Sequence, residues 1–369
     1  MFVLFCFLYL FCFSYSYSFL LTYHNVTSKN SSFVASVATN NDVNTIWSNP
    51  SNIEHIETIQ LSFTHGLPFI GLKGSEYLEQ VDNTNYEPGI TENIFSAGIP
   101  LKKYGYTGIG VYRISLGNFY SDNLVFITYG RNVNKKFLSG AALKIFYREY
   151  GKDRYTEHYE VFRKKGYSKT AYTIDIAGTY KLLEHMNFAM VLHNITQPNL
   201  SLTDIKEDNY PLTARIGFGI NTEKYKFGIE LDYDLLSETS QQTKFFTSVE
   251  YNLFGRLDLS SSLGIGSNNY YDVAFGTRLN VVRNLSISYA VKYPLSGLKN
   301  VSTHKVGIDF IFYPKKEVEV HIQQEIKQQE VQQQKDTVTL QKQEQKTKVR
   351  IRSSVIKKIK KFFKKNEQK

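Results

Sequence analysis

The chain has 369 residues, a formal net charge of +10 and 15% aromatic residues. Its mean hydropathy of −0.32 argues against a bundle of membrane-spanning helices, but not against a β-barrel, whose lipid-facing residues alternate with polar ones. Residues 315–369 hold 16 Lys/Arg and 7 Asp/Glu, so the remaining residues are nearly neutral. The basicity therefore belongs to the tail, and nucleic acid is not expected as a partner.

The N-terminal segment resembles a signal peptide. Residues 1–13 (MFVLFCFLYLFCF) form an almost unbroken apolar run that is too short to span a bilayer. Small residues at Ser16 and Ser18 suit a cleavage after residue 18. The alternative is a buried apolar strand. Both cysteines lie within residues 1–18, so we expect no disulfide in the mature chain.

From about Glu57 onward, the sequence repeats stretches in which apolar and polar residues alternate. One example is 224–234 (KYKFGIELDYD), which ends in polar residues as strands do. Stretches of about ten or more residues fit tilted strands that cross the hydrocarbon layer. Strands in soluble proteins average about five or six residues. The pattern therefore favours a membrane barrel over a soluble all-β fold.

The alternation predicts fourteen strands in residues 56–313 and an all-β, antiparallel transmembrane β-barrel. An even number allows closure, and lipid requires closure because it cannot satisfy an open sheet edge. The predicted strands are 56–65, 92–101, 105–116, 122–131, 136–149, 168–181, 184–195, 210–221, 224–234, 242–253, 256–266, 271–282, 284–293 and 302–313.

The predicted connections alternate between short and long. Links such as 182–183, 222–223 and 254–255 contrast with the stretches 150–167 and 196–209. With both termini in the periplasm, the short links lie there and the long ones lie outside the cell, as barrels usually arrange them.

Residues 314–369 form a separate tail, which we expect to be helical or disordered and to lie in the periplasm. Residues 315–348 are rich in Gln, Glu and Lys and lack Gly and Pro. Residues 349–365 predict a basic amphipathic helix that binds anionic lipid or a cell-wall polymer. The side chains expected to make that contact are Lys357, Lys358, Lys360, Lys361, Lys364 and Lys365.

Two segments carry a resemblance to a known family. Residues 42–53 read DVNTIWSNPSNI, and residues 185–200 read HMNFAMVLHNITQPNL. Both resemble the FadL-like outer-membrane transport proteins, in particular the PorV/PorQ branch. The resemblance implies a fourteen-stranded barrel whose N-terminal segment, here residues 19–55, folds into the lumen as a hatch. It places the hatch turn at Asn49 and Pro50, while Ser51 and Asn52 stand where the family usually has Ala and Gly.

The resemblance implies a location in the outer membrane of a diderm bacterium and leaves two functions open. One is passive transport of hydrophobic compounds, with a hydrophobic small molecule as the ligand. The other is a PorV-like role as a platform in protein secretion or cell-envelope anchoring, with secretion-system proteins as partners. The predicted inward faces carry mixed charges and no long apolar track, which argues slightly against a dedicated lipid channel.

No enzymatic activity, cofactor or metal is expected. None of the eight His residues forms H-x-x-x-H or pairs with Cys. His193-Asn194 hints at a Ser–His–Asn membrane hydrolase, but a lone His at a strand end is more often structural. Gly108-x-Gly110 and Gly217-x-Gly219 lie inside predicted strands, where glycine indicates close packing or a kink and not a phosphate loop.

Overall fold

The computed structural model describes residues 37–70, 89–153, 156–202, 208–236, 243–267, 269–296 and 301–313. The predicted signal peptide (1–18), the first part of the hatch segment (19–36) and the tail (314–369) with its six lysines lie outside the described residues. The chain divides into two units at residue 313. The barrel is described by itself.

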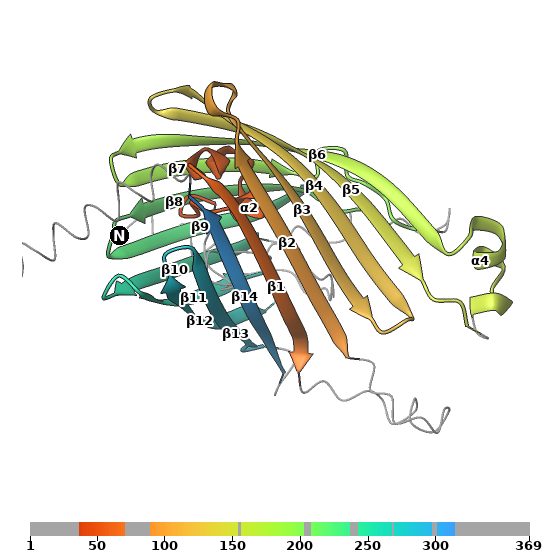
Figure 1. The fold of residues 1–369 in the computed structure, drawn as a ribbon. Coiled ribbons are helices and arrows are strands. Elements are labelled where there is room, and N and C mark those ends of the chain that lie inside the picture. Colours follow the sequence, from red (N-terminus) through yellow and green to blue (C-terminus); the bar gives the residue numbers. More distant parts are fainter. Residues whose placement is uncertain are drawn as a thin grey trace, which may run out of the picture. The chain divides into compact units, whose positions relative to one another are not determined.

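Fourteen antiparallel strands form a closed barrel, as predicted (Figure 1). Each strand pairs with its neighbours in sequence, and β1 closes the ring on β14 through pairs such as Ile59 with Phe312. The strands are β1 (Ile59–Ile70), β2 (Ile90–Pro100), β3 (Tyr106–Leu116), β4 (Tyr120–Asn134), β5 (Phe137–Tyr150), β6 (Ser168–Leu183), β7 (Met186–His193), β8 (Leu212–Asn221), β9 (Tyr225–Leu236), β10 (Thr243–Leu253), β11 (Leu257–Gly266), β12 (Tyr270–Val282), β13 (Leu285–Pro294) and β14 (Ser302–Phe312).

The largest differences from the predicted boundaries are at β1, predicted at 56–65 and observed at 59–70, and at the end of β4, which lies at residue 134 and not 131; at the end of β6 the difference is two residues. β1 begins at Ile59 and not at residue 56, because Ile56 caps the preceding helix and is fully buried. β6 continues through the predicted link 182–183, and the chain turns at residues 184–185 instead. In both places an apolar residue extends the alternation into a neighbouring element, so the pattern alone does not mark the boundary.

Burial is inverted relative to a soluble protein. In β9, the carboxylate-bearing Glu230 is only 2% exposed, whereas Phe227 is 38% exposed. The same inversion holds around the ring, where large apolar side chains face outward on every strand and charged ones face the lumen. An apolar exterior of this kind is stable in lipid and not in water. Within the described residues, no helix is long and apolar enough to cross a membrane.

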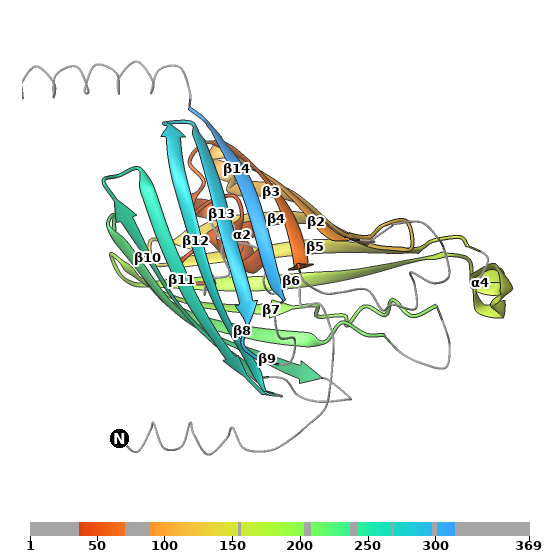
Figure 2. The ribbon, with the colours of Figure 1, turned by 90° about the horizontal axis from the view of Figure 1, so that it is seen from below.

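The two ends of the barrel differ. At one end, which we call the turn end, six connections of two to five residues join the strands, and β1 begins and β14 ends there. The opposite end, the loop end, carries the longer connections. Connection 151–167 contains η4 (Thr156–His158) and α4 (Glu160–Lys165), and it projects beyond β5 and β6 (Figures 1 and 2). The predicted alternation of short and long connections is thus present.

A short N-terminal segment lies inside the ring of strands (Figures 1 and 2). It comprises α2 (Thr45–Ser48) and η2 (Pro50–His55), and its apolar residues join those of the barrel wall in one buried cluster. We refer to residues 37–58 as the hatch. All of its contacts with glycines of the wall lie near the turn end.

The inverted exterior gives a direct stability prediction. Phe275 faces outward near the middle of β12, between Ser261 and Val291. Phe275→Lys places an ammonium near the centre of the bilayer, and we expect it to lower the free energy of unfolding by about 2–4 kcal/mol. Reversible urea unfolding in lipid vesicles measures this loss.

The matched control is Phe254→Lys, in the turn between β10 and β11, where the side chain is 93% exposed. We expect a loss of less than about 1 kcal/mol there, as for positions near the interface. Equal losses at the two positions would contradict the assignment of the apolar belt to lipid.

Candidate functional site

The hatch turn is held by the side chain of Asn49. Asn49 has an extended backbone and caps η2, with its side-chain oxygen accepting from Ser51 N at 3.0 Å. Asn is a favoured N-cap and proline a favoured first helical residue, so the Asn49-Pro50 order specifies this helix start. The Asn49 amide nitrogen also donates to Val37 O at 2.7 Å and to Thr179 Oγ1 at 2.9 Å. The Asn49 side chain thus forms hydrogen bonds with the turn (Ser51), with the start of the described hatch (Val37) and with strand β6 (Thr179).

Ser51 and Asn52 extend this attachment. Ser51 Oγ lies 2.8 Å from Thr179 Oγ1 and donates to Asn49 Oδ1 at 2.6 Å. Asn52 accepts from Thr179 Oγ1 at 2.7 Å and donates to Val37 O at 3.0 Å. Both residues are completely buried. The departures from the Ala and Gly of the resembled family therefore add polar contacts between the hatch and the wall.

Glycines in the wall let the hatch backbone approach closely. A Cβ at Gly140 would lie 2.4 Å from both Pro50 C and Ser51 N, which are backbone atoms that could move only if the hatch itself shifted. A Cβ at Gly130 would lie 2.8 Å from Pro50 O. Gly108 and Gly110 leave room for hatch side chains instead, those of Ile46 and Trp47. The prediction that Gly108-x-Gly110 marks close packing is confirmed.

The start of the hatch is attached to a second part of the wall. Val37 N donates to Glu230 Oε2 at 2.9 Å, and Glu230 also pairs with the Arg215 guanidinium. Arg215 Nε donates to Asp232 Oδ1 at 3.0 Å. Gly219, from the predicted Gly217-x-Gly219 pair, lies against the Ala38 backbone. The hatch therefore contacts β8 and β9 as well as β5 and β6.

Trp47 joins the hatch to the apolar part of the lumen. Its indole N–H donates to Ser96 Oγ at 2.7 Å, and its ring meets the Phe126 ring edge-on with centroids 4.9 Å apart. The buried cluster around it runs along the inward faces of β2 to β5 and includes Ile94, Tyr112, Ile114, Leu124, Phe126, Ala142 and Phe146. The prediction of no apolar track is wrong on this side of the lumen.

The reason lies in the sequence of β3 and β4. Residues 109–112 (IGVY) of β3 and 124–127 (LVFI) of β4 are apolar on both faces, so alternation does not reveal an apolar inward face there. On β9 to β14, by contrast, most inward residues are charged or small, as predicted; the exceptions include Phe246 of β10 and Tyr270 of β12, whose rings meet edge-on.

The connection 194–211 contacts the inward face from the loop end. Leu200 is buried in the same apolar cluster, and the Tyr210 ring stacks on Phe146 with centroids 4.7 Å apart. Asp208 forms an ion pair with Arg148, whose guanidinium also binds both oxygens of Asp122 at 2.7 and 2.9 Å. This connection therefore packs into the barrel mouth.

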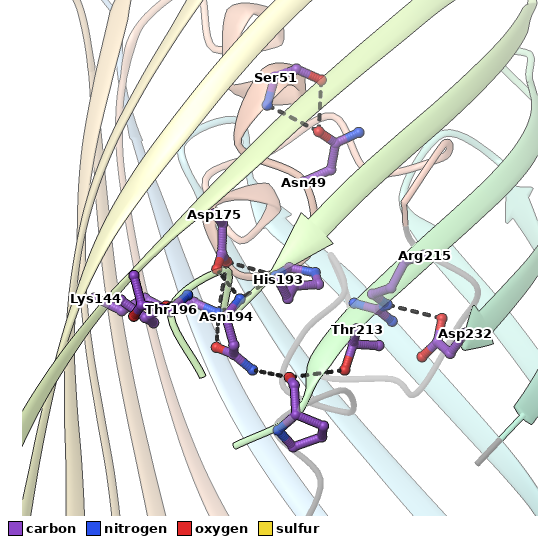
Figure 3. A network of polar contacts seen from close by, with 12 residues as sticks. Asn49, Ser51, Lys144, Asp175, His193, Asn194, Thr196, Thr213, Arg215 and Asp232 are labelled. Atoms are coloured by element: carbon purple, nitrogen blue, oxygen red, sulfur yellow. Dashed lines mark hydrogen bonds and ion pairs between the residues drawn. The ribbon is translucent and has the colours of Figure 1, made fainter. Parts of the chain in front are cut away.

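Neighbouring strands contribute a buried polar network to the lumen (Figure 3). Lys144 Nζ lies 2.7 Å from Asp175 Oδ2, and His193 Nδ1 lies 2.6 Å from the same oxygen. Asn194 N donates to Asp175 Oδ1 at 2.9 Å, and its side-chain oxygen accepts from Lys144 at 3.1 Å. His193-Asn194, the possible hydrolase pair, is thus part of a structural ion-pair network.

The end of η2 adds one more attachment point. Glu54 accepts from Asn132 Nδ2 at 3.0 Å and lies 3.5 Å from Lys181 Nζ. Burial, together with the positive charge of Lys181, lowers the pKa of His55, so that His55 is neutral at pH 7. In the part of the chain that the structure describes, no group of three or more His, Cys, Asp or Glu is placed to hold a metal ion.

The structure has Asn49 and Pro50, the hatch turn implied by the resemblance, at the start of η2. Sequence reasoning did not identify Thr179, the wall partner of this turn. Lys144 and Asp175 were not singled out either, and His193 was considered only as part of a possible hydrolase pair. Their only signal is a polar residue at an inward position of a strand, and that signal does not say which residues meet. The six tail lysines predicted as membrane contacts lie outside the described residues.

Comparisons with known proteins place this geometry in a family. Residues 42–310 match the family model described as type IX secretion system membrane protein PorP/SprF. No curated protein matches the chain.

Several solved structures share the fold. The toluene transporter TodX of Pseudomonas putida is 10% identical, with a TM-score of 0.54 over 79% of this chain and 100% of that one. The monoaromatic hydrocarbon channel CymD is 9% identical, with a TM-score of 0.53 over 76% and 95%. A FadL homologue of Pseudomonas aeruginosa is 10% identical, with a TM-score of 0.51 over 76% and 96%.

At these identities the structural likeness shows a FadL-like fold and nothing about ligands. The predicted likeness to FadL-like barrels is confirmed at that level, while the PorV/PorQ branch stays a prediction. The family model covers most of the barrel and part of the hatch. The chain belongs to the PorP/SprF family of type IX secretion system membrane proteins, and its barrel lies in the outer membrane of a diderm bacterium.

Proposed function

We propose that this barrel acts as a closed platform of the type IX secretion system and not as a channel for hydrophobic compounds. The observation that carries the proposal is the attachment of the hatch. It approaches the wall backbone-to-backbone at Gly140, shares three hydrogen-bonding contacts with Thr179 and donates from Val37 N to Glu230.

These attachments make the hatch costly to remove. Leaving a buried polar group without a partner costs about 1–3 kcal/mol, and Asn49, Ser51, Asn52 and Glu230 would all lose partners at once. Hatch and wall would separate only if water or a partner replaced these bonds. A plugged barrel serves best as an anchor on which other proteins assemble.

The proposed partners are other proteins of the secretion system, in line with the family description. We place the turn end in the periplasm, because membrane barrels have short periplasmic turns and long external loops. β14 ends at the turn end, so the tail from residue 314 would enter the periplasm. There its basic segment would bind anionic lipid or a cell-wall polymer, as its sequence suggests.

A second candidate function is passive transport of a hydrophobic compound. The observation in its favour is the apolar, aromatic inward face of β3 to β5, with Tyr112, Phe126 and Phe146. Such a surface suits an apolar ligand. Trp47 of the hatch and Tyr210 of connection 194–211 already cover parts of it, so a ligand would have to displace them.

One purification separates the two functions. The barrel is extracted from native membranes in mild detergent after brief chemical cross-linking, and both proteins and small molecules are identified by mass spectrometry. We expect secretion-system proteins to be cross-linked to it and no stoichiometric hydrophobic compound. A bound hydrophobic compound without protein partners would favour the transport function.

The hatch attachment predicts electrical behaviour. We expect the wild-type barrel to conduct little in planar bilayers. Gly140→Ala inserts a methyl group into the Pro50–Ser51 backbone, and we expect the displaced hatch to raise conductance several-fold. The matched control is Gly89→Ala, where a Cβ meets nothing within 4 Å and conductance should not change. A wild-type barrel that already conducts as an open pore would contradict the closed platform.

Thr179 provides a second, independent test. Thr179→Val keeps the shape of the side chain but removes the hydroxyl that contacts Asn49, Ser51 and Asn52. We expect the free energy of hatch opening to fall by about 1–3 kcal/mol. Amide exchange in residues 45–55, followed by mass spectrometry, should then accelerate about five-fold or more.

The control for this variant is Thr277→Val, at a half-buried, outward-facing position of β12. It should leave exchange in residues 45–55 unchanged. Unchanged exchange in Thr179→Val as well would show that the hydrogen bonds to the wall do not hold the hatch.

A further inference from the structure

Five of the six turns at the turn end of the barrel contain at least one Lys or Arg. The turns 101–105, 135–136, 184–185, 222–224, 254–256 and 283–284 hold seven Lys or Arg and two Glu, a balance of +5. All seven cationic side chains are exposed. We call these residues the basic rim: Lys102, Lys103, Lys135, Lys136, Lys224, Arg256 and Arg283.

The loop end does not share this charge. Its connections are 71–89, 117–119, 151–167, 194–211, 237–242, 267–269 and 295–301. Together they hold eight Lys or Arg and eleven Asp or Glu, a balance of −3. The positive charge is therefore concentrated at the turn end and is not a general property of the barrel surface.

Large apolar side chains stand among the rim cations. Phe254 immediately precedes Gly255-Arg256, and Tyr104, which follows Lys103, is 65% exposed. Leu183, the last residue of β6 before turn 184–185, is also 65% exposed. Exposed rings and aliphatic chains beside cations are typical of the membrane–water interface, where the apolar part enters the lipid and the charge meets the headgroups. A surface for an acidic protein in water would not need them.

The charge is densest at two neighbouring turns. β3 pairs with β4, so turn 101–105 lies next to turn 135–136, and Arg131 on the outward face of β4 lies between them. The first turn is fixed: Leu101 N donates to Gly105 O at 2.8 Å, and Tyr129 OH donates to Tyr104 O at 2.5 Å.

The second turn is fixed as well. Asn134 Oδ1 accepts from Lys136 N and from Phe137 N, both at 2.9 Å. Five cations are thus presented on rigid backbone, immediately beyond the apolar belt: Lys102, Lys103, Arg131, Lys135 and Lys136.

We infer that the basic rim is a binding surface for anionic phospholipid headgroups of the leaflet at the turn end, with its strongest site at turns 101–105 and 135–136. The chemistry is that of a phosphodiester anion held by several ammonium groups beside inserted rings. In the orientation proposed above, this leaflet is the periplasmic one, which contains phospholipid. The barrel would then be fixed at the end where β1 begins and β14 ends.

The test compares three full-length proteins in nanodiscs that contain equal amounts of phosphatidylglycerol and phosphatidylcholine. They are the wild type, a rim variant and a loop-end control with the same loss of four charges. The rim variant carries K102Q, K103Q, K135Q and K136Q, and the control carries R163Q, K164Q, K165Q and K169Q, all at exposed positions. The basic tail is present in all three, so its contribution cancels. Heat-modifiable migration on gels verifies that each barrel is folded.

Native mass spectrometry then counts the lipids that stay bound. Each cation near an anionic surface changes binding about five-fold. We therefore expect the preference for phosphatidylglycerol over phosphatidylcholine to be lower in the rim variant than in the wild type by a factor of about ten or more. The control should keep it, and about 0.5 M salt should weaken it in the wild type. Equal retention of both lipids by the wild type, or an equal loss in the control, would overturn the inference.

A protein partner gives a different outcome. If the rim variant keeps its lipid preference but loses proteins that co-purify from native envelopes, the rim binds protein and the lipid inference is wrong. Both faces of the nanodisc carry the same lipid, so the result does not depend on which end faces the periplasm. A failure here is therefore distinct from a failure of the proposed orientation or of the platform function.

Discussion

Lipid offers no partner for an unpaired backbone N–H or C=O group, and the rest of this structure depends on that constraint. The sheet closes through the pairing of β1 with β14, which removes both edges. Alternation along the strands then directs most charged residues of the wall into the lumen. There the charges are shielded from bulk water and must pair, as Lys144 does with Asp175 and Lys305 with Glu92. The lumen thus becomes a protein core built largely of polar groups.

The hatch fits this core unevenly. On β3 to β6 it is fixed by glycine contacts and by the bonds around Thr179. Towards β12 its Asp42 carboxylate lies 4.0 Å from Arg278 Nη1, and that nitrogen has no hydrogen-bond partner within the described part of the chain. The hatch therefore has a firmly bonded side and a weakly bonded side.

Local patterns predicted the wall well because the side-chain period of a strand is independent of its partners. That is why fourteen strands and the short turns followed from the sequence. The hatch turn at Asn49-Pro50 followed from resemblance, and capping chemistry explains its shape. The partners of the turn were out of reach, because Thr179 lies 130 residues from Asn49 and meets it only after the barrel closes. Likewise, the pairing of Arg215 with Asp232 depends on the register of β8 against β9.

The two ends of the lumen are covered by different parts of the chain. This covering is an argument against transport through the barrel, whereas the likeness to hydrocarbon channels shows only a shared fold. At the turn end the hatch lies against the wall glycines. At the loop end, connection 194–211 brings Tyr210 onto Phe146 and Asp208 onto Arg148. A compound crossing the barrel would have to displace both segments, which would break the ion pair between Asp208 and Arg148 and the buried hydrogen bonds and apolar contacts of the hatch. A platform needs neither displacement. In the proposed platform role, both attachments would stiffen the barrel.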